Sequence, residues 1–193
     1  MAITLAGTTG ITTPGLTNSG NETITGTLNV GGLTPNVYPI VSGTAVASTS
    51  GTSIDFTSIP SWVKRITVMF SGVSTSGTSP ILLQIGAGSV DATGYNCSGI
   101  NSDGINVGGA NYTTGFALRQ TSAAMLSGGS VVLNTLGSNI WAVNGFVGTA
   151  SAVIGIFWTA GNKSLSGTLD RVRITTVNGT DTFDAGSINL LWE

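Results

Sequence analysis

In four segments of the chain every second residue is apolar, which gives each segment one apolar face. They are residues 66–70, 81–85, 172–175 and 188–192. Successive side chains of a β-strand point to opposite faces, so this alternation predicts strands with one buried face. The apolar positions that we expect to share one core are Val68, Phe70, Leu83, Ile174 and Leu190.

Further β-prone runs lie between clusters of Gly, Ser and Asn, which are typical of turns. These runs are residues 54–57, 116–120, 131–135, 140–147 and 153–159. About nine or ten short strands with frequent turns predict an all-β fold, and specifically a jelly-roll-like β-sandwich. No segment predicts a convincing helix, since residues 122–126 would form one turn at most.

The pattern changes near residue 45. Residues 1–45 hold β-prone runs of about three or four residues, separated by Gly, Pro and Asn. Such runs bury too little apolar surface to offset the entropy of ordering them, so they need copies of themselves or a partner. A disordered leader is the alternative. We expect a β-structured attachment or shaft segment over residues 1–45 and a β-sandwich head domain over residues 46–193.

Charged side chains are scarce: the 193 residues include eight acidic and six basic ones, and no histidine. Acid–base and nucleophilic catalysis need titratable groups held in pairs, so this composition argues against an enzyme. A net charge of -2 and a pI of about 4.8 offer no basic surface to nucleic acid. A mean hydropathy of +0.36 with so few charges favours surfaces that are buried by self-association.

No metal or cofactor is expected. Cys97 is the only cysteine, which excludes an internal disulfide and, without histidine, a Cys/His zinc site. Asp103 with Asp91 offers too few carboxylates for calcium, so Asp103 is expected in an Asx-stabilised turn. No apolar run approaches the roughly 18 residues of a spanning helix, and no secretory signal is recognisable, so no membrane insertion is expected.

The most polar stretch of the chain is the candidate for ligand contact. Tyr95 and Tyr112 flank a Gly/Asn/Ser-rich segment that we expect to be a long loop, and loops on rigid scaffolds commonly carry recognition. Aromatic faces beside amides and hydroxyls suit a neutral glycan. The candidate ligand-binding residues are Tyr95, Asn96, Asn101, Asp103, Asn111, Tyr112 and Trp141.

Packing is the alternative role for the aromatic candidates. The two tyrosines would then sit at the base of a turn, and Trp141 would lie in the core. Trp158 and Trp192 share a strand face with apolar residues, so they are expected in the core or in an interface. Trp62 is expected at one end of the sandwich. Arg171 and Arg173 are expected as solvated charges that protect a sheet from aggregation.

Three segments resemble tail fibres and related virion appendages of tailed bacteriophages. They are SIDFTSIPSWVKRITVMFSGVSTSG (residues 53–77), LDRVRITTVNGTDTFDAGSINLLWE (residues 169–193) and MAITLAGTTGITT (residues 1–13). The resemblance covers about one third of the chain. It implies a homotrimer with the N-terminus attached to the particle and the β domain distal, and it assigns no ligand-binding residue.

Together these features predict a virion protein, synthesised in the host cytoplasm, that acts by binding. The leading hypothesis is a trimeric tail fibre that attaches to other virion proteins through residues 1–45. Its β domain would contact a host surface glycan without catalysis, and linked weak sites raise avidity by ~10²–10⁴. The alternative is a purely structural component that binds only virion proteins: a capsid decoration, a head fibre, or a tail or baseplate connector.

Overall fold

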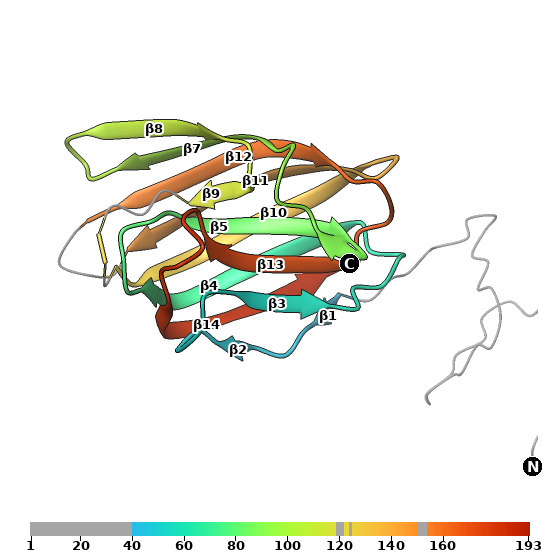
Figure 1. Cartoon of the computed structure of the whole chain (residues 1–193), viewed down its shortest axis with the longest axis horizontal. Helices are drawn as coiled ribbons and strands as arrows, with labels where there is room; N and C mark the ends of the chain where they lie inside the picture. The colour runs from blue at the N-terminus through green and yellow to red at the C-terminus, as the bar shows by residue number, and fades with distance from the viewer. Residues whose placement is uncertain (1–39, 119–121, 124, 150–153) are drawn as a thin grey trace, which may run out of the picture. The chain divides into compact units, whose positions relative to one another are not determined.

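The computed structural model describes residues 40–118, 122–123, 125–149 and 154–193 (Figure 1). These residues belong to one compact unit, Tyr38–Glu193. Residues 1–39, most of the predicted attachment segment, lie outside the described residues. Strand β1 (Val41–Ser42) pairs with the last strand of the chain, so the β structure begins before residue 46. No helix in the described part is long and apolar enough to cross a membrane.

The described residues form two antiparallel sheets and no helix, which confirms the all-β prediction. The larger sheet has nine strands in the order β1–β14–β4–β10–β11–β12–β7–β8, and β2 also pairs with β14. The bounds beyond β1 are Val46–Ala47 (β2), Arg65–Thr75 (β4), Asn96–Ser102 (β7), Val107–Tyr112 (β8), Ser127–Gly137 (β10), Ile140–Thr149 (β11), Ile156–Ser164 (β12) and Phe183–Trp192 (β14).

The smaller sheet has five strands in the order β3–β13–β5–β6, and β9 also pairs with β5, at residues 81–83. Its strands are Ile54–Thr57 (β3), Ile81–Ala87 (β5), Ser89–Val90 (β6), Phe116–Leu118 (β9) and Arg171–Thr176 (β13). In Figure 1 this sheet overlies part of the larger one, and a single buried cluster contains side chains of both.

That cluster contains all five side chains predicted to share a core, each at most 4% exposed. The prediction is therefore confirmed. Phe116, Phe157 and Phe183 are the largest fully buried side chains. Burial of each such side chain contributes about 1.5–3 kcal/mol, so these rings are major contributors to stability.

The predicted loop between Tyr95 and Tyr112 is instead a hairpin formed by β7 and β8, with only residues 103–106 between the strands. The loop prediction is wrong because the inward positions of β7 include Cys97 and Gly99, both buried and both small. Small inward residues hide the apolar alternation that marks a strand.

The turn of this hairpin is formed as predicted around Asp103. Its Oδ1 accepts hydrogen bonds from the backbone N–H groups of Ile105 and Asn106 at 2.9 and 2.6 Å. The Asn106 side chain donates to Oδ2 at 3.1 Å. These bonds lower the pKa of the Asp103 carboxyl to about 2, with the backbone bond from Asn106 as the largest cause.

Trp158 does not lie in the core. It is 41% exposed and faces outward from β12, while its neighbour Phe157 faces inward. The core alternative for Trp158 is therefore wrong, and the interface alternative stays a prediction. Trp62 and Trp192 are partly buried against the core.

Candidate binding groove

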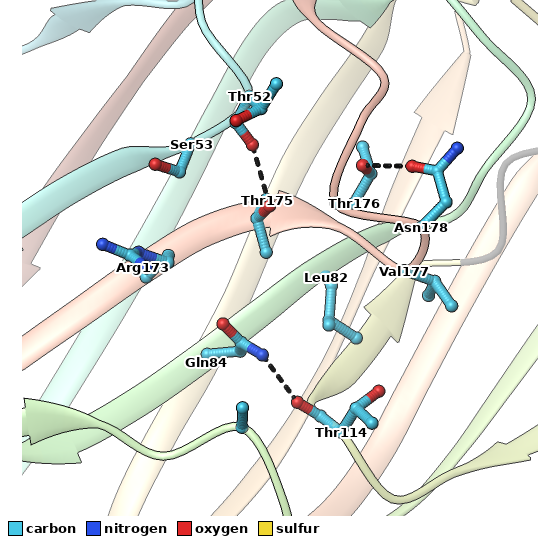
Figure 2. A pocket seen from close by; sticks show the side chains of 12 residues that line it. Thr52, Ser53, Leu82, Gln84, Thr114, Arg173, Thr175, Thr176, Val177 and Asn178 are labelled. Carbon is cyan, nitrogen blue, oxygen red and sulfur yellow. Dashed lines mark hydrogen bonds between the residues drawn. The ribbon is translucent and has the colours of Figure 1, made fainter.

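A groove of about 370 Å³ opens on the outer face of the smaller sheet (Figure 2). Neighbouring positions of β5 and β13 line it, since Gln84 pairs with Arg173 and Leu82 with Thr175. The other lining residues come from residues 52–53, 92, 114 and 176–179. Side chains two positions apart on a strand share a face, which is why these four meet in one groove.

Hydrogen bonds hold the polar lining in place. The Gln84 Nε2 donates to the carbonyl of Thr114 at 2.8 Å, and Figure 2 shows the amide oxygen on the opposite side of that side chain. The Thr175 hydroxyl donates to the carbonyl of Thr52 at 2.8 Å. Because these side chains are already oriented, a ligand would lose little of its binding energy to ordering them.

The groove carries no net charge. Arg173, its only charged lining residue, forms two hydrogen bonds with the carboxylate of Asp55, at 2.6 and 2.7 Å. The same carboxylate raises the pKa of the Arg173 guanidinium. The pair is exposed and contributes little to stability, but it neutralises this end of the groove.

Asn178 makes one rim of the groove rigid. Its Oδ1 accepts hydrogen bonds from the Thr176 hydroxyl at 2.8 Å and from the backbone N–H of Thr180 at 3.1 Å. Its Nδ2 donates to the carboxylate of Asp181 at 2.7 Å. The turn that follows β13 is therefore held by its own side chains.

Tyr95, a predicted ligand contact, is placed in the core at 3% exposure. Its hydroxyl receives a hydrogen bond from the Ile85 N–H at 2.8 Å and donates to the Asp91 carbonyl at 2.8 Å. Its ring packs edge-on against Phe116, with centroids 5.0 Å apart. Lys163, whose ammonium is 2.9 Å from the Asp91 carboxylate, lies over the same ring. In this placement Tyr95 presents no free aromatic face.

Trp141 and Tyr112 also pack inward. Trp141 is 4% exposed and lines a small cavity of about 120 Å³ together with Lys64 and Asn139. Tyr112 is partly buried against the core. The structure therefore favours the packing alternative for the predicted aromatic contacts.

The predicted polar contacts are distributed over different surfaces. Asn96 and Asn111 are exposed on the outer face of the larger sheet, where the Ser98 hydroxyl donates to the Asn111 Oδ1 at 2.9 Å. Asn101 is half-buried, and its Oδ1 has no hydrogen-bond partner among the described residues. Trp141 faces the core, so it lies on the opposite face of the sheet from Asn96.

Sequence reasoning missed the groove residues. Gln84 interrupts the apolar run of β5, and Arg173 and Thr175 are the polar positions of β13. The polarity of these positions indicates that they face outward. It does not indicate that residues 52, 114 and 178 lie beside them. Contacts between such distant segments are not readable from periodicity.

No protein-family model, curated protein or solved structure matches this chain. Function is therefore inferred from the strand order, the groove and the sheet surfaces.

Proposed function

We propose that this protein is a non-catalytic adhesin of a bacteriophage particle: a homotrimeric tail fibre whose β domain binds a neutral host surface glycan. The observation that carries the proposal is the neutral groove, with its pre-oriented hydroxyl and amide lining on a rigid sheet.

The strand order supports a jelly-roll β-sandwich. Eight strands pair as β2–β14–β4–β10 in the larger sheet and as β3–β13–β5–β9 in the smaller one. Two antiparallel four-stranded sheets connected in this order are the arrangement of a jelly roll, which occurs in viral capsid and lectin domains. The hairpin β7–β8 and the pair β11–β12 are then insertions that extend the larger sheet.

The chemistry of the groove suits a neutral sugar. Thr175, Gln84 and Asn178 carry groups that exchange hydrogen bonds with sugar hydroxyls. Val177, which is 41% exposed, adds apolar contact for the C–H face of a ring. No carboxylate lines the groove, whereas glycoside hydrolysis uses two, which supports adhesion over cleavage.

The resemblance of residues 1–13, 53–77 and 169–193 to phage fibres supports the location on a virion. In the proposed trimer, residues 1–45 attach to other virion proteins and three grooves act together. A weak single site then suffices, because linkage raises avidity by ~10²–10⁴.

The proposed test fills the groove with a large side chain and leaves the core residues unchanged. Ala92 is exposed and lines the groove, so Ala92→Trp fills it, while exposed Ala45, outside the groove, supplies the control Ala45→Trp. Labelled full-length protein is applied to an array of neutral and sialylated oligosaccharides. We expect wild type and Ala45→Trp to bind neutral glycans, and Ala92→Trp to bind at least about tenfold more weakly, which corresponds to a loss of about 1.4 kcal/mol or more in binding free energy. Equal binding by both variants would exclude the groove.

A purely structural virion role is the second candidate. It is favoured by the exposed apolar side chains Phe146, Trp158 and Ile100 on the outer surface of β11, β12 and β7, which suit contact with protein. Absence of any glycan binding, together with incorporation of the protein into particles, would favour this role.

A further inference from the structure

Exposed apolar side chains form one continuous row across the inserted strands of the larger sheet. Phe146 of β11 pairs with Trp158 of β12, and Trp158 pairs with Ile100 of β7. The three side chains are 61%, 41% and 41% exposed. Paired positions on neighbouring strands share a face, so these side chains form one patch.

The next row on the same face extends the patch. Ile156 pairs with Ser102, which in turn pairs with Val107 of β8, and both Ile156 and Val107 are exposed. We call Ile100, Val107, Phe146, Ile156 and Trp158 the apolar face. Pairing from β11 through β8 proceeds without a register shift, so this part of the sheet is regular.

Charge is absent from the outer face of the strands that carry the apolar face, although β4 and β14 of the same sheet carry Arg65 and Asp184. Strands β7, β8, β11 and β12 contain one charged residue, Lys163, and it is turned inward and buried. The outer face of the smaller sheet instead carries Asp55, Arg171 and Arg173, typical of a surface that stays in water. Because the apolar face offers no charge to a partner, the surface that fits it best also lacks charge.

The apolar face is large enough to form the centre of a protein interface, but not the whole of one. Strands β11, β12, β7 and β8, which carry it, lie side by side, and at about 4.8 Å per neighbour and about 3.3 Å per residue they span roughly 14 by 30 Å. A standard interface buries about 800 Å² per partner. Central aromatic residues such as Trp158 are typical of interface hot spots.

We infer that the apolar face is covered by a second copy of this chain. The inference rests on the homotrimer of the proposed function and assigns it a contact surface. A second copy is the occupant that this chain always has available, and its low overall charge offers no repulsion to self-association.

Cysteine accessibility tests the inference on the full chain. Ala160 is exposed beside Trp158 on the same strand face, so Ala160→Cys places a thiol at the proposed contact. Ala92→Cys, in the segment after β6 that lines the groove, is the matched exposed control, and buried Cys97 gives the wild-type baseline. We expect maleimide to label Ala160→Cys at least about tenfold more slowly than Ala92→Cys, because a covered group reacts only through opened molecules. Both should label equally fast in denaturant.

Native mass spectrometry of the same samples separates the outcomes. An oligomer with a protected Ala160→Cys thiol supports the inference. An oligomer in which both thiols react equally overturns the inference and leaves the proposed trimer intact. A monomer overturns both the inference and the trimer, and a monomer with a protected thiol shows that the chain covers its own face. Glycan binding is measured separately through Ala92→Trp.

A second variant checks the patch itself. Phe146→Ser with Trp158→Ser should leave folding intact, because both side chains face outward, and should weaken association at least about tenfold, a loss typical of interface hot spots. Val177→Ser, at an apolar position just after β13 that is as exposed as Trp158, at 41%, should leave association unchanged. Equal association of both variants would contradict the inference.

Discussion

At the scale of single residues, the hydroxyl of Tyr95 ties β5 to the segment that follows β6 from inside the core. It bonds the backbone of both Ile85 and Asp91, and burial raises its pKa above the ordinary 10.0. A buried backbone N–H that loses its acceptor costs the full desolvation of that group. The role of Tyr95 is therefore to satisfy the backbone where the chain turns.

Tyr95→Phe should lower the free energy of unfolding by about 1–3 kcal/mol at neutral pH, since the Ile85 N–H loses its acceptor. Because the folded-state pKa is raised, the unfolded tyrosine ionises first as pH rises above 10.0, and wild type then loses stability. The difference between wild type and variant should shrink above that pH. Urea unfolding at neutral and alkaline pH measures this difference in the free energy of unfolding. A difference that stays constant with pH would contradict the buried placement of the Tyr95 hydroxyl.

Phe70→Ala should cost about 3–5 kcal/mol, the usual loss for a buried Phe. Phe70 faces the core from β4, whereas its neighbour Met69 faces outward and is half-buried. The control Met69→Ala should lower the free energy of unfolding by clearly less than Phe70→Ala does. Denaturant unfolding gives both values, and a change below about 1 kcal/mol for Phe70→Ala would show that the strand face is reversed.

At the scale of elements, the two insertions depend on close approach of β12 to β7. Gly161 pairs with Cys97, and a Cβ added at Gly161 would lie 2.1 Å from the Asn96 carbonyl oxygen. A side chain there must push the strands apart. At Gly148, in the neighbouring strand β11, the nearest atom would be 3.9 Å away.

Gly161→Ala should therefore destabilise the domain by about 1–3 kcal/mol and raise amide exchange in β7 and β8, as expected for overpacking. Gly148→Ala should stay within about 0.5 kcal/mol of wild type. Hydrogen-exchange mass spectrometry locates the effect. If exchange in the hairpin stays at the wild-type level in Gly161→Ala, the hairpin is not docked through β12.

Periodicity predicted those strands whose inward side chains are large. Val68 and Phe70 identified β4, and Ile174 identified β13. It missed β7 because Cys97 and Gly99 are small. It also left open whether the tyrosines and Trp141 contact a ligand or pack, and the structure favours packing. The groove is assembled from residues 52, 84, 114 and 175, and tertiary packing alone brings these together.

At the scale of the whole molecule, the described unit has two outer surfaces of different chemistry. The smaller sheet carries two ion pairs and a neutral groove. The larger sheet carries the apolar face on β11, β12, β7 and β8, and its own ion pair, Arg65 with Glu193, lies on β4. This asymmetry fits a protein that assembles through one sheet and binds a ligand through the other. In a trimer, each copy would contribute one groove.

The oligomeric state of the full chain tests this account most directly. Native mass spectrometry at micromolar concentration should show one species of three chains of 19.4 kDa each. The expected trimer follows from the low charge, the apolar face and the resemblance to phage fibres. A monomer or a dimer under the same conditions would contradict the account.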